Sequence, residues 1–331
     1  MLIDVHAHMI TPRMLNADAF WGPFMTTSGF TIGKFCLGTA QPSSGTDKDA
    51  TAKLLDKMSH DSRRSVMRAR HVDKIVVSIP SNAFMYWAGD FGNTYAALCN
   101  NELSAYCNED PDHFAFWAHA NLADPKTAAT EIERAVTELG AKGVCVGGAN
   151  FNGLEAHSRE LFPVWEMISN LDVPIMVHGY SQSIWTGDDH TSDLFATTSI
   201  LGDCYDESLF FWYLICGGAL DAFPNLKVYV THAGGMSLFQ LGRLEALNAS
   251  IANDRRNKKS LSEYLPNFWF DLDVHTPSLR RAVVDIVGVD RIVHGTNFGA
   301  HDFGDPTEGL NLSDIDSRKI RSVNAVNLLK L

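Results

Sequence analysis

Short apolar runs rich in β-branched residues alternate with longer helical patterns along the whole chain, and this alternation constrains the fold most strongly. Such alternation is typical of βα units around a parallel sheet. It predicts eight strands, over residues 2–6, 74–79, 113–119, 143–147, 174–178, 227–232, 268–274 and 291–295. Eight strands that are each followed by a helical segment predict a (β/α)8 TIM barrel. A doubly wound sheet is the alternative, but Gly-x-Gly-x-x-Gly does not follow the first strand.

Helical patterns lie between these runs, for example over residues 128–139, 161–171 and 313–329. Two connections are long, over residues 9–50 after the first strand and 180–206 after the fifth. In a barrel both lie at the C-terminal ends of the strands, where active sites occur. Loops of this length usually bind or enclose a ligand, with an oligomer contact as the alternative for the first. No repeat or linker divides the chain, so we predict one domain over residues 1–331.

The composition limits the classes of partner. The chain has 331 residues, of which 45% are hydrophobic and 20% charged, and it contains no apolar run of the ~18 residues that cross a bilayer. Its net charge of -12 disfavours nucleic acid and anionic membranes as partners. Six cysteines without C-x-x-C spacing indicate free thiols in a reducing compartment. No signal-peptide pattern precedes Asp4, so we expect a cytoplasmic protein.

Histidines follow several of the predicted strands. His6 and His8 close the first strand and share one face, because alternate side chains of a strand point the same way. His178 ends the fifth strand and His232 the sixth. Unpartnered buried imidazoles are costly, whereas neutral imidazole is a common metal ligand, so four converging histidines predict a metal site at the barrel mouth. Asp4 shares their face one step deeper and is predicted to be a structural carboxylate.

The motifs around these histidines resemble those of the amidohydrolase superfamily. They are Asp4-x-His6-x-His8, His178 at the end of the fifth strand, His232-x-Gly234-Gly235 and Gly295-Thr296-Asn297. More narrowly, the chain resembles the branch with aminocarboxymuconate-semialdehyde, γ-resorcylate and 5-carboxyvanillate decarboxylases and oxalomesaconate hydratase. The resemblance implies one divalent ion, usually zinc. It also implies the ligands, which are His6, His8, His178 and residue 297, with His232 beside them as a catalytic or substrate-orienting group.

Position 297 departs from the motif, which places a carboxylate there. An amide oxygen coordinates weakly, and an amide cannot carry a proton as a carboxylate does. An isosteric change within intact motifs favours an inactivated Asp-to-Asn variant. The alternatives are a natural divergence, in which His301 or Asp302 supplies the lost carboxylate or proton, and a binding protein without catalysis.

The resemblance implies a metal-dependent, non-oxidative decarboxylase of a hydroxylated aromatic or heteroaromatic acid, of the hydroxybenzoate or hydroxypicolinate type. His232 and Asn297 are the expected catalytic residues, and the amide predicts slow turnover. A hydrolase or hydratase that uses an activated water is the alternative. Further candidates for substrate contact are Arg243, Trp185, Phe298, His301 and Asp302. The resemblance also suggests a homodimer or homotetramer.

Overall fold

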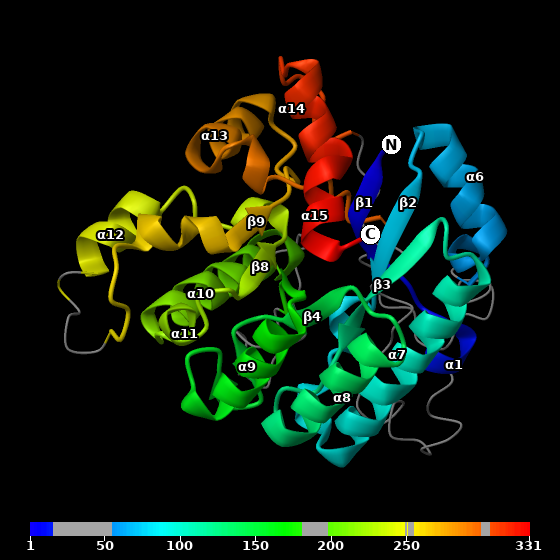
Figure 1. Cartoon of the computed structure of the whole chain (residues 1–331), viewed down its shortest axis with the longest axis horizontal. Helices are drawn as coiled ribbons and strands as arrows, with labels where there is room; N and C mark the ends of the chain where they lie inside the picture. The colour runs from blue at the N-terminus through cyan, green and yellow to red at the C-terminus, as the bar shows by residue number, and fades with distance from the viewer. Residues whose placement is uncertain (16–54, 181–197, 249, 251–254, 299–304) are drawn as a thin grey trace.

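Seven parallel strands form one curled sheet in the computed structural model, which describes residues 1–15, 55–180, 198–248, 250, 255–298 and 305–331 (Figure 1). The strands pair in the order β1-β2-β3-β4-β7-β8-β9. Their bounds are β1 Ile3–His8, β2 Lys74–Ser78, β3 Phe114–His119, β4 Gly143–Gly147, β7 Pro174–His178, β8 Lys227–Val230 and β9 Phe268–Phe270. A separate antiparallel hairpin consists of β5 Asn150–Phe151 and β6 Leu154–Glu155. Seven of the eight predicted strands are therefore confirmed, with small shifts at their ends.

The prediction of an eighth regular strand is wrong. That part of the chain instead joins both edges of the sheet through isolated bridges, which pair Ile292 with β9 and Phe298 with β1. A continuous ladder is interrupted because the backbone N–H of Thr296 donates to the side chain of Asp4, at 3.1 Å. Asn297 then adopts a left-handed conformation, with φ of 57°, which a strand does not accommodate. The last barrel position is thus an irregular segment.

Helices cover the outside of the sheet (Figure 1). They are α1 Pro12–Leu15, α6 His60–Arg70, α7 Asp90–Glu109, α8 Pro125–Thr137, α9 Phe162–Leu171, α10 Asp203–Cys216, α11 Ala219–Ala222, α12 Leu241–Asn248, α13 Pro277–Val287, α14 Asp314–Arg318 and α15 Asn324–Leu329. The 3-10 turns are η1 Ser81–Ala83, η2 Tyr86–Ala88, η3 Arg159–Leu161, η7 His232–Gly234, η8 Leu261–Asn267 and η9 Val289–Arg291, and the π-helical turns are η6 Thr198–Gly202 and η10 Lys319–Val323.

Helix α8 illustrates how the sequence determines these elements. The side chain of Asp124 accepts a hydrogen bond from the N–H of Thr127, which caps the helix, and Pro125 occupies its first turn. The buried residues Ala128, Ile132 and Ala135 lie three and four positions apart, so they form one face against the sheet. The helix predicted over residues 128–139 is therefore confirmed, with a start three residues earlier.

The two long connections lie largely outside the described residues, which omit 16–54 and 181–197. The described parts are more helical than expected, because α1 follows β1 and α10 begins at Asp203. Asp203 and Asp206 in the first turn of α10 favour a helix start there, since carboxylates interact well with the positive end of the helix dipole.

The strand register decides which side chains point into the barrel. Directly paired residues of neighbouring parallel strands face the same side of the sheet. His8 pairs with Ser78, and His178 pairs with Gly147, so polar side chains from distant strands reach the same end of the barrel. Below them the interior is filled by Trp117, Met176 and Tyr229, all fully buried.

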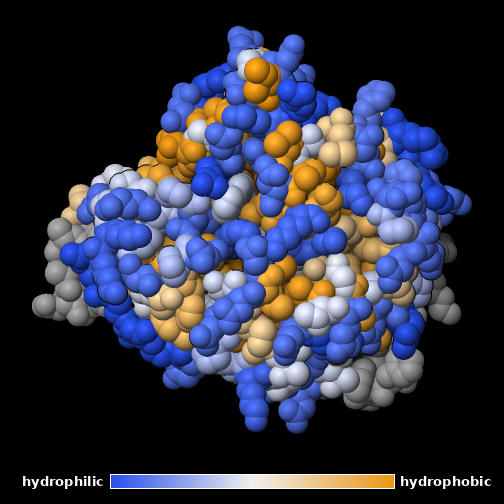
Figure 2. All heavy atoms as spheres, viewed as in Figure 1, coloured by the Kyte–Doolittle hydropathy of each residue, from blue (hydrophilic) through white to orange (hydrophobic). Residues whose placement is uncertain are grey.

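Hydrophilic residues cover most of the face in Figure 2, and apolar residues show between the elements and over α13 and α14. Exposed apolar side chains on these two helices include Leu279, Ile286 and Ile315. In the described part of the chain, none of the helices combines the length and apolar character needed to cross a membrane. The described cysteines Cys99, Cys107, Cys145, Cys204 and Cys216 are free thiols, as predicted.

Candidate active site

Four histidine rings gather at the C-terminal ends of the strands. His6 and His8 come from β1, His178 from β7 and His232 from the turn after β8. Five of the six ring pairs have centroids between 4.9 and 5.4 Å apart. The structure therefore brings together the four histidines that the sequence singled out.

The Nδ1 atoms of His178 and His8 face the barrel wall. His178 donates from Nδ1 to the carbonyl of Gly179 at 2.9 Å. The Nδ1 of His8 lies 3.2 Å from the hydroxyl of Ser78. Since a hydrogen bond at one ring nitrogen fixes the orientation of the other, both Nε2 atoms are directed to the centre of the cluster.

The other two histidines face buried carboxylates. The Nδ1 of His6 lies 3.4 Å from a carboxylate oxygen of Asp271, and the Nδ1 of His232 donates to Glu207 at 2.7 Å. Both carboxylates are fully buried. Burial lowers the pKa of His232, but the carboxylates of Glu207, Asp273 and Asp271 together outweigh burial and raise this pKa to about 10.

The remaining nitrogens fit a divalent metal ion. Burial lowers the pKa of His6, His8 and His178, so these rings are neutral and offer lone pairs. The Nε2 atoms of His6 and His178 are buried without a hydrogen-bond partner among the described residues. Nitrogens of His6, His178 and His232 lie within 4.8 Å of one another, which is close enough to share one ion.

Asn297 bridges two of these rings. Its Oδ1 lies 3.0 Å from the Nε2 of His8, and its Nδ2 donates to the Nε2 of His232 at 3.2 Å. The side chain is 5% exposed. Position 297 therefore lies at the centre of the cluster, where the motif would place a carboxylate, and an amide occupies it.

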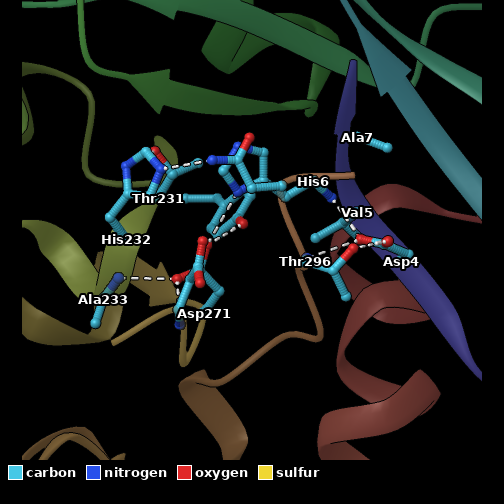
Figure 3. A network of polar contacts seen from close by, with 12 residues as sticks. Asp4, Val5, His6, Ala7, Thr231, His232, Ala233, Asp271 and Thr296 are labelled. Carbon is cyan, nitrogen blue, oxygen red and sulfur yellow. Dashed lines mark hydrogen bonds and ion pairs between the residues drawn. The ribbon is translucent and has the colours of Figure 1, made fainter. Parts of the chain in front are cut away.

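Asp4 holds the irregular segment that contains Thr296 and Asn297 against β1 (Figure 3). Its carboxylate accepts from the backbone N–H of His6 at 3.1 Å, and from the N–H and hydroxyl of Thr296 at 3.1 and 2.5 Å. Burial raises the pKa of Asp4 to about 6, against the opposing effect of these bonds. Asp4 is therefore structural, and it fixes the residue next to Asn297.

The family model for amidohydrolases matches residues 3–331. The chain belongs to this family.

Three relatives of this amidohydrolase are named as decarboxylases or as a hydratase. A γ-resorcylate decarboxylase from Polaromonas sp. strain JS666 is 27% identical over 86% of this chain and 92% of that protein. A 2-amino-3-carboxymuconate-6-semialdehyde decarboxylase from Dictyostelium discoideum is 26% identical over 72% of this chain and 66% of that protein. A 2-keto-4-carboxy-3-hexenedioate hydratase from Sphingobium sp. is 27% identical over 75% of this chain and 72% of that protein.

A solved structure has the same fold. The dihydroxybenzoic acid decarboxylase from Polaromonas sp. JS666, with bound manganese and the inhibitor 2-nitroresorcinol, superposes with a TM-score of 0.80. It is 24% identical in sequence and covers 100% of this amidohydrolase and 97% of its own chain. The comparison supports a barrel of the amidohydrolase type, although the sheet described here has seven regular strands.

Sequence reasoning missed the two carboxylates behind the histidines. Asp271 directly follows β9 and also accepts from the hydroxyl of Tyr229 at 2.7 Å and from the N–H of Ala233 at 2.8 Å (Figure 3). An acidic residue within the apolar run predicted as a strand over residues 268–274 was a signal that could have identified it. Glu207 lies within α10, and no sequence pattern pointed to it, because it does not lie in or next to a predicted strand.

The other candidates of this amidohydrolase are placed less centrally. The ring of Phe298 is 3% exposed and lies 4.5 Å from the guanidinium of Arg63 on α6. Arg243 is exposed on α12, which lies at the edge of the molecule, away from β1 (Figure 1). The candidates that lie outside the described residues are Trp185, His301 and Asp302.

Proposed function

We propose that this amidohydrolase is a metal-dependent, non-oxidative decarboxylase of a hydroxylated aromatic or heteroaromatic acid. The observation that carries the proposal is the cluster of four histidines around Asn297, in which every Nδ1 lies within 3.4 Å of an oxygen atom of the surrounding wall. The decarboxylase names of its relatives support this reaction, and the γ-resorcylate and dihydroxybenzoic acid decarboxylases among them support a substrate of the hydroxybenzoate type.

We propose that His6, His8, His178 and Asn297 hold one divalent ion, and that zinc is the native metal. Three neutral imidazoles and one amide oxygen suit zinc, although manganese is present in the similar solved structure. When bound, the ion supplies Lewis-acid stabilisation of negative charge on the substrate's carboxylate and neighbouring hydroxyl oxygens. The group of nitrogens within 4.8 Å includes His232 in place of His8, so His232 is the alternative third imidazole.

In this proposal His232 donates the proton that the substrate ring requires. Decarboxylation requires that the ring carbon bearing the carboxylate gains a proton, and that the electrons of the broken carbon–carbon bond return to the ring as carbon dioxide leaves. In its charged form the His232 ring carries a proton on both nitrogens, and it delivers the proton on Nε2, which faces residue 297. Asn297 orients the His232 ring but cannot itself donate in place of a carboxylic acid. We therefore expect substrate binding with slow turnover.

Hydration is the second candidate function, because one relative is named as a hydratase. In a hydratase the ion would activate a water, and the same histidines would orient it against a carbon–carbon double bond. The two functions differ in product, since only decarboxylation releases carbon dioxide.

A carbon dioxide release assay tests the proposal. The purified protein and Asn297→Asp are supplied with zinc or manganese and a panel of hydroxybenzoates and hydroxypicolinates, and their metal content is measured in parallel. We expect release from at least one acid and its loss in His178→Ala. His113→Ala is the matched control, because His113 is 47% exposed and pairs with Asp110 away from the cluster. Full metal loading without release from any acid by either protein would refute a decarboxylase.

A further inference from the structure

We infer that Glu207 is a positioning residue, which holds His232 with its Nε2 facing the substrate side of the cluster. The inference rests on the proposed role of His232 in proton transfer. It assigns a function to a carboxylate that belongs to α10, outside the strand ends and turns that carry the four histidines.

Glu207 connects the ends of two strands through a single oxygen. Its Oε1 accepts from the N–H of Gly179 at 3.0 Å, from the hydroxyl of Thr231 at 2.6 Å and from the Nδ1 of His232 at 2.7 Å. Gly179 follows β7, and its carbonyl in turn accepts from His178. One buried carboxylate thus contacts the His232 ring after β8 directly, and it also binds the backbone of Gly179, whose carbonyl accepts from His178 at the end of β7.

The hydrogen bond to Glu207 selects one tautomer of His232. A carboxylate accepts but does not donate, so the proton of the neutral ring resides on Nδ1. When the ring is neutral, the Nε2 is free to accept from Asn297, whose Nδ2 lies 3.2 Å away. His232 also has a left-handed backbone, with φ of 49°, a conformation that a non-glycine residue keeps only where surrounding contacts hold it.

Glu207 also supplies a negative charge next to His232. The motif at position 297 would place a carboxylate at the Nε2 side of the ring, but Asn297 is uncharged there. Glu207 lies at the opposite, Nδ1 side, is fully buried, and its Oε1 is 2.7 Å from that nitrogen. A charged His232 is therefore stabilised from α10, and an imidazolium formed during the reaction remains next to its counter-charge.

Two substitutions separate the charge of Glu207 from its hydrogen bond. Glu207→Gln keeps an acceptor oxygen and loses the charge, whereas Glu207→Leu loses both. We expect kcat to fall about 10-fold or more in Glu207→Gln and further in Glu207→Leu, with KM changed by less than about 3-fold, as is typical when an orienting partner is removed.

Nitrogen NMR of metal-free protein labelled with ¹⁵N-histidine provides a readout that does not depend on turnover. The His232 signals are assigned by their loss in His232→Gln. We expect a proton on Nδ1 of His232 in the unmodified protein, whether the ring is charged or neutral, and a mixture of tautomers or the Nε2–H tautomer in Glu207→Leu. A cooperative thermal transition in each variant establishes that it is folded.

Asp206→Asn is the matched control, because Asp206 is equally buried on the same helix. Its carboxylate accepts from the backbone N–H of Ala149 at 2.9 Å and of Tyr180 at 2.8 Å, and these bonds do not involve His232. We expect this variant to lower the melting temperature while leaving the His232 tautomer unchanged.

The inference would be overturned if folded Glu207→Leu retained both the Nδ1–H tautomer and the kcat of the unmodified protein. An equal change of tautomer in Asp206→Asn would also overturn it. Should the unmodified protein release no carbon dioxide, the proposed decarboxylase fails, but the tautomer measurement still decides whether Glu207 holds His232.

Discussion

Replacing Asn297 with aspartate perturbs the centre of the cluster by one charge and almost no volume. The new carboxylate would lie where the amide now contacts His8 at 3.0 Å and His232 at 3.2 Å. The site is 5% exposed, so water screens this charge little. We expect Asn297→Asp to bind metal more tightly and to turn over faster than the unmodified protein.

The size of the effect follows from the two roles of a carboxylate at this position. General acid–base catalysis by a well-placed group contributes roughly 10²- to 10⁴-fold, which corresponds to about 3–5 kcal/mol in activation free energy. Burial of the new charge opposes this gain, but His232, whose pKa is raised, lies within hydrogen-bond distance, and unit charges ~4 Å apart attract by about 4 kcal/mol at an effective dielectric constant near 20. We therefore expect kcat to rise at least ~10²-fold.

The assay measures kcat for carbon dioxide release at saturating metal, together with the metal dissociation constant, for both proteins. Asn311→Asp is the control, because it adds the same charge at an exposed position. Equal kcat and equal metal affinity in Asn297→Asp and the unmodified protein would refute the reasoning. That result would indicate that another group carries the proton, and that residue 297 is not a ligand.

Three further expectations follow. Asp271→Asn should weaken metal binding about 10- to 100-fold, because Asp271 faces His6, and a metal titration measures this effect. The same variant should lower the free energy of unfolding by about 1–3 kcal/mol in denaturant unfolding, because Asp271 accepts from Tyr229 and Ala233. Chelation of the metal should abolish carbon dioxide release and lower the melting temperature. Free metal at about 100 times its dissociation constant should restore ~2.7 kcal/mol of stability. An unchanged melting curve would contradict metal binding by the cluster. Gly147→Ala should destabilise the fold by about 1–3 kcal/mol in thermal unfolding, because its methyl group would clash with the ring of Phe84; unchanged stability would show that this ring can move aside.

The sequence by itself determined the framework of this protein. Alternating apolar runs and helical patterns located seven strands, because these signals depend on residues close together in the chain. The same patterns placed His6, His8, His178 and His232 at strand ends, and a parallel sheet brings all such ends to one side. The convergence of the four histidines follows from this geometry.

Only the tertiary structure decided which residues contact these histidines from the barrel wall and which residue lies among their rings. Glu207 reaches His232 from a helix 25 residues earlier, and Asp4 binds Thr296 across 292 residues. Such contacts depend on how helices and strands pack, which no local pattern encodes. The irregular segment after β9 has the same origin, because the Asp4 carboxylate replaces a ladder partner and leaves Asn297 in a left-handed conformation. The sequence thus determined which imidazoles meet, and packing determined their orientation, their charge partners and the position of the amide among them.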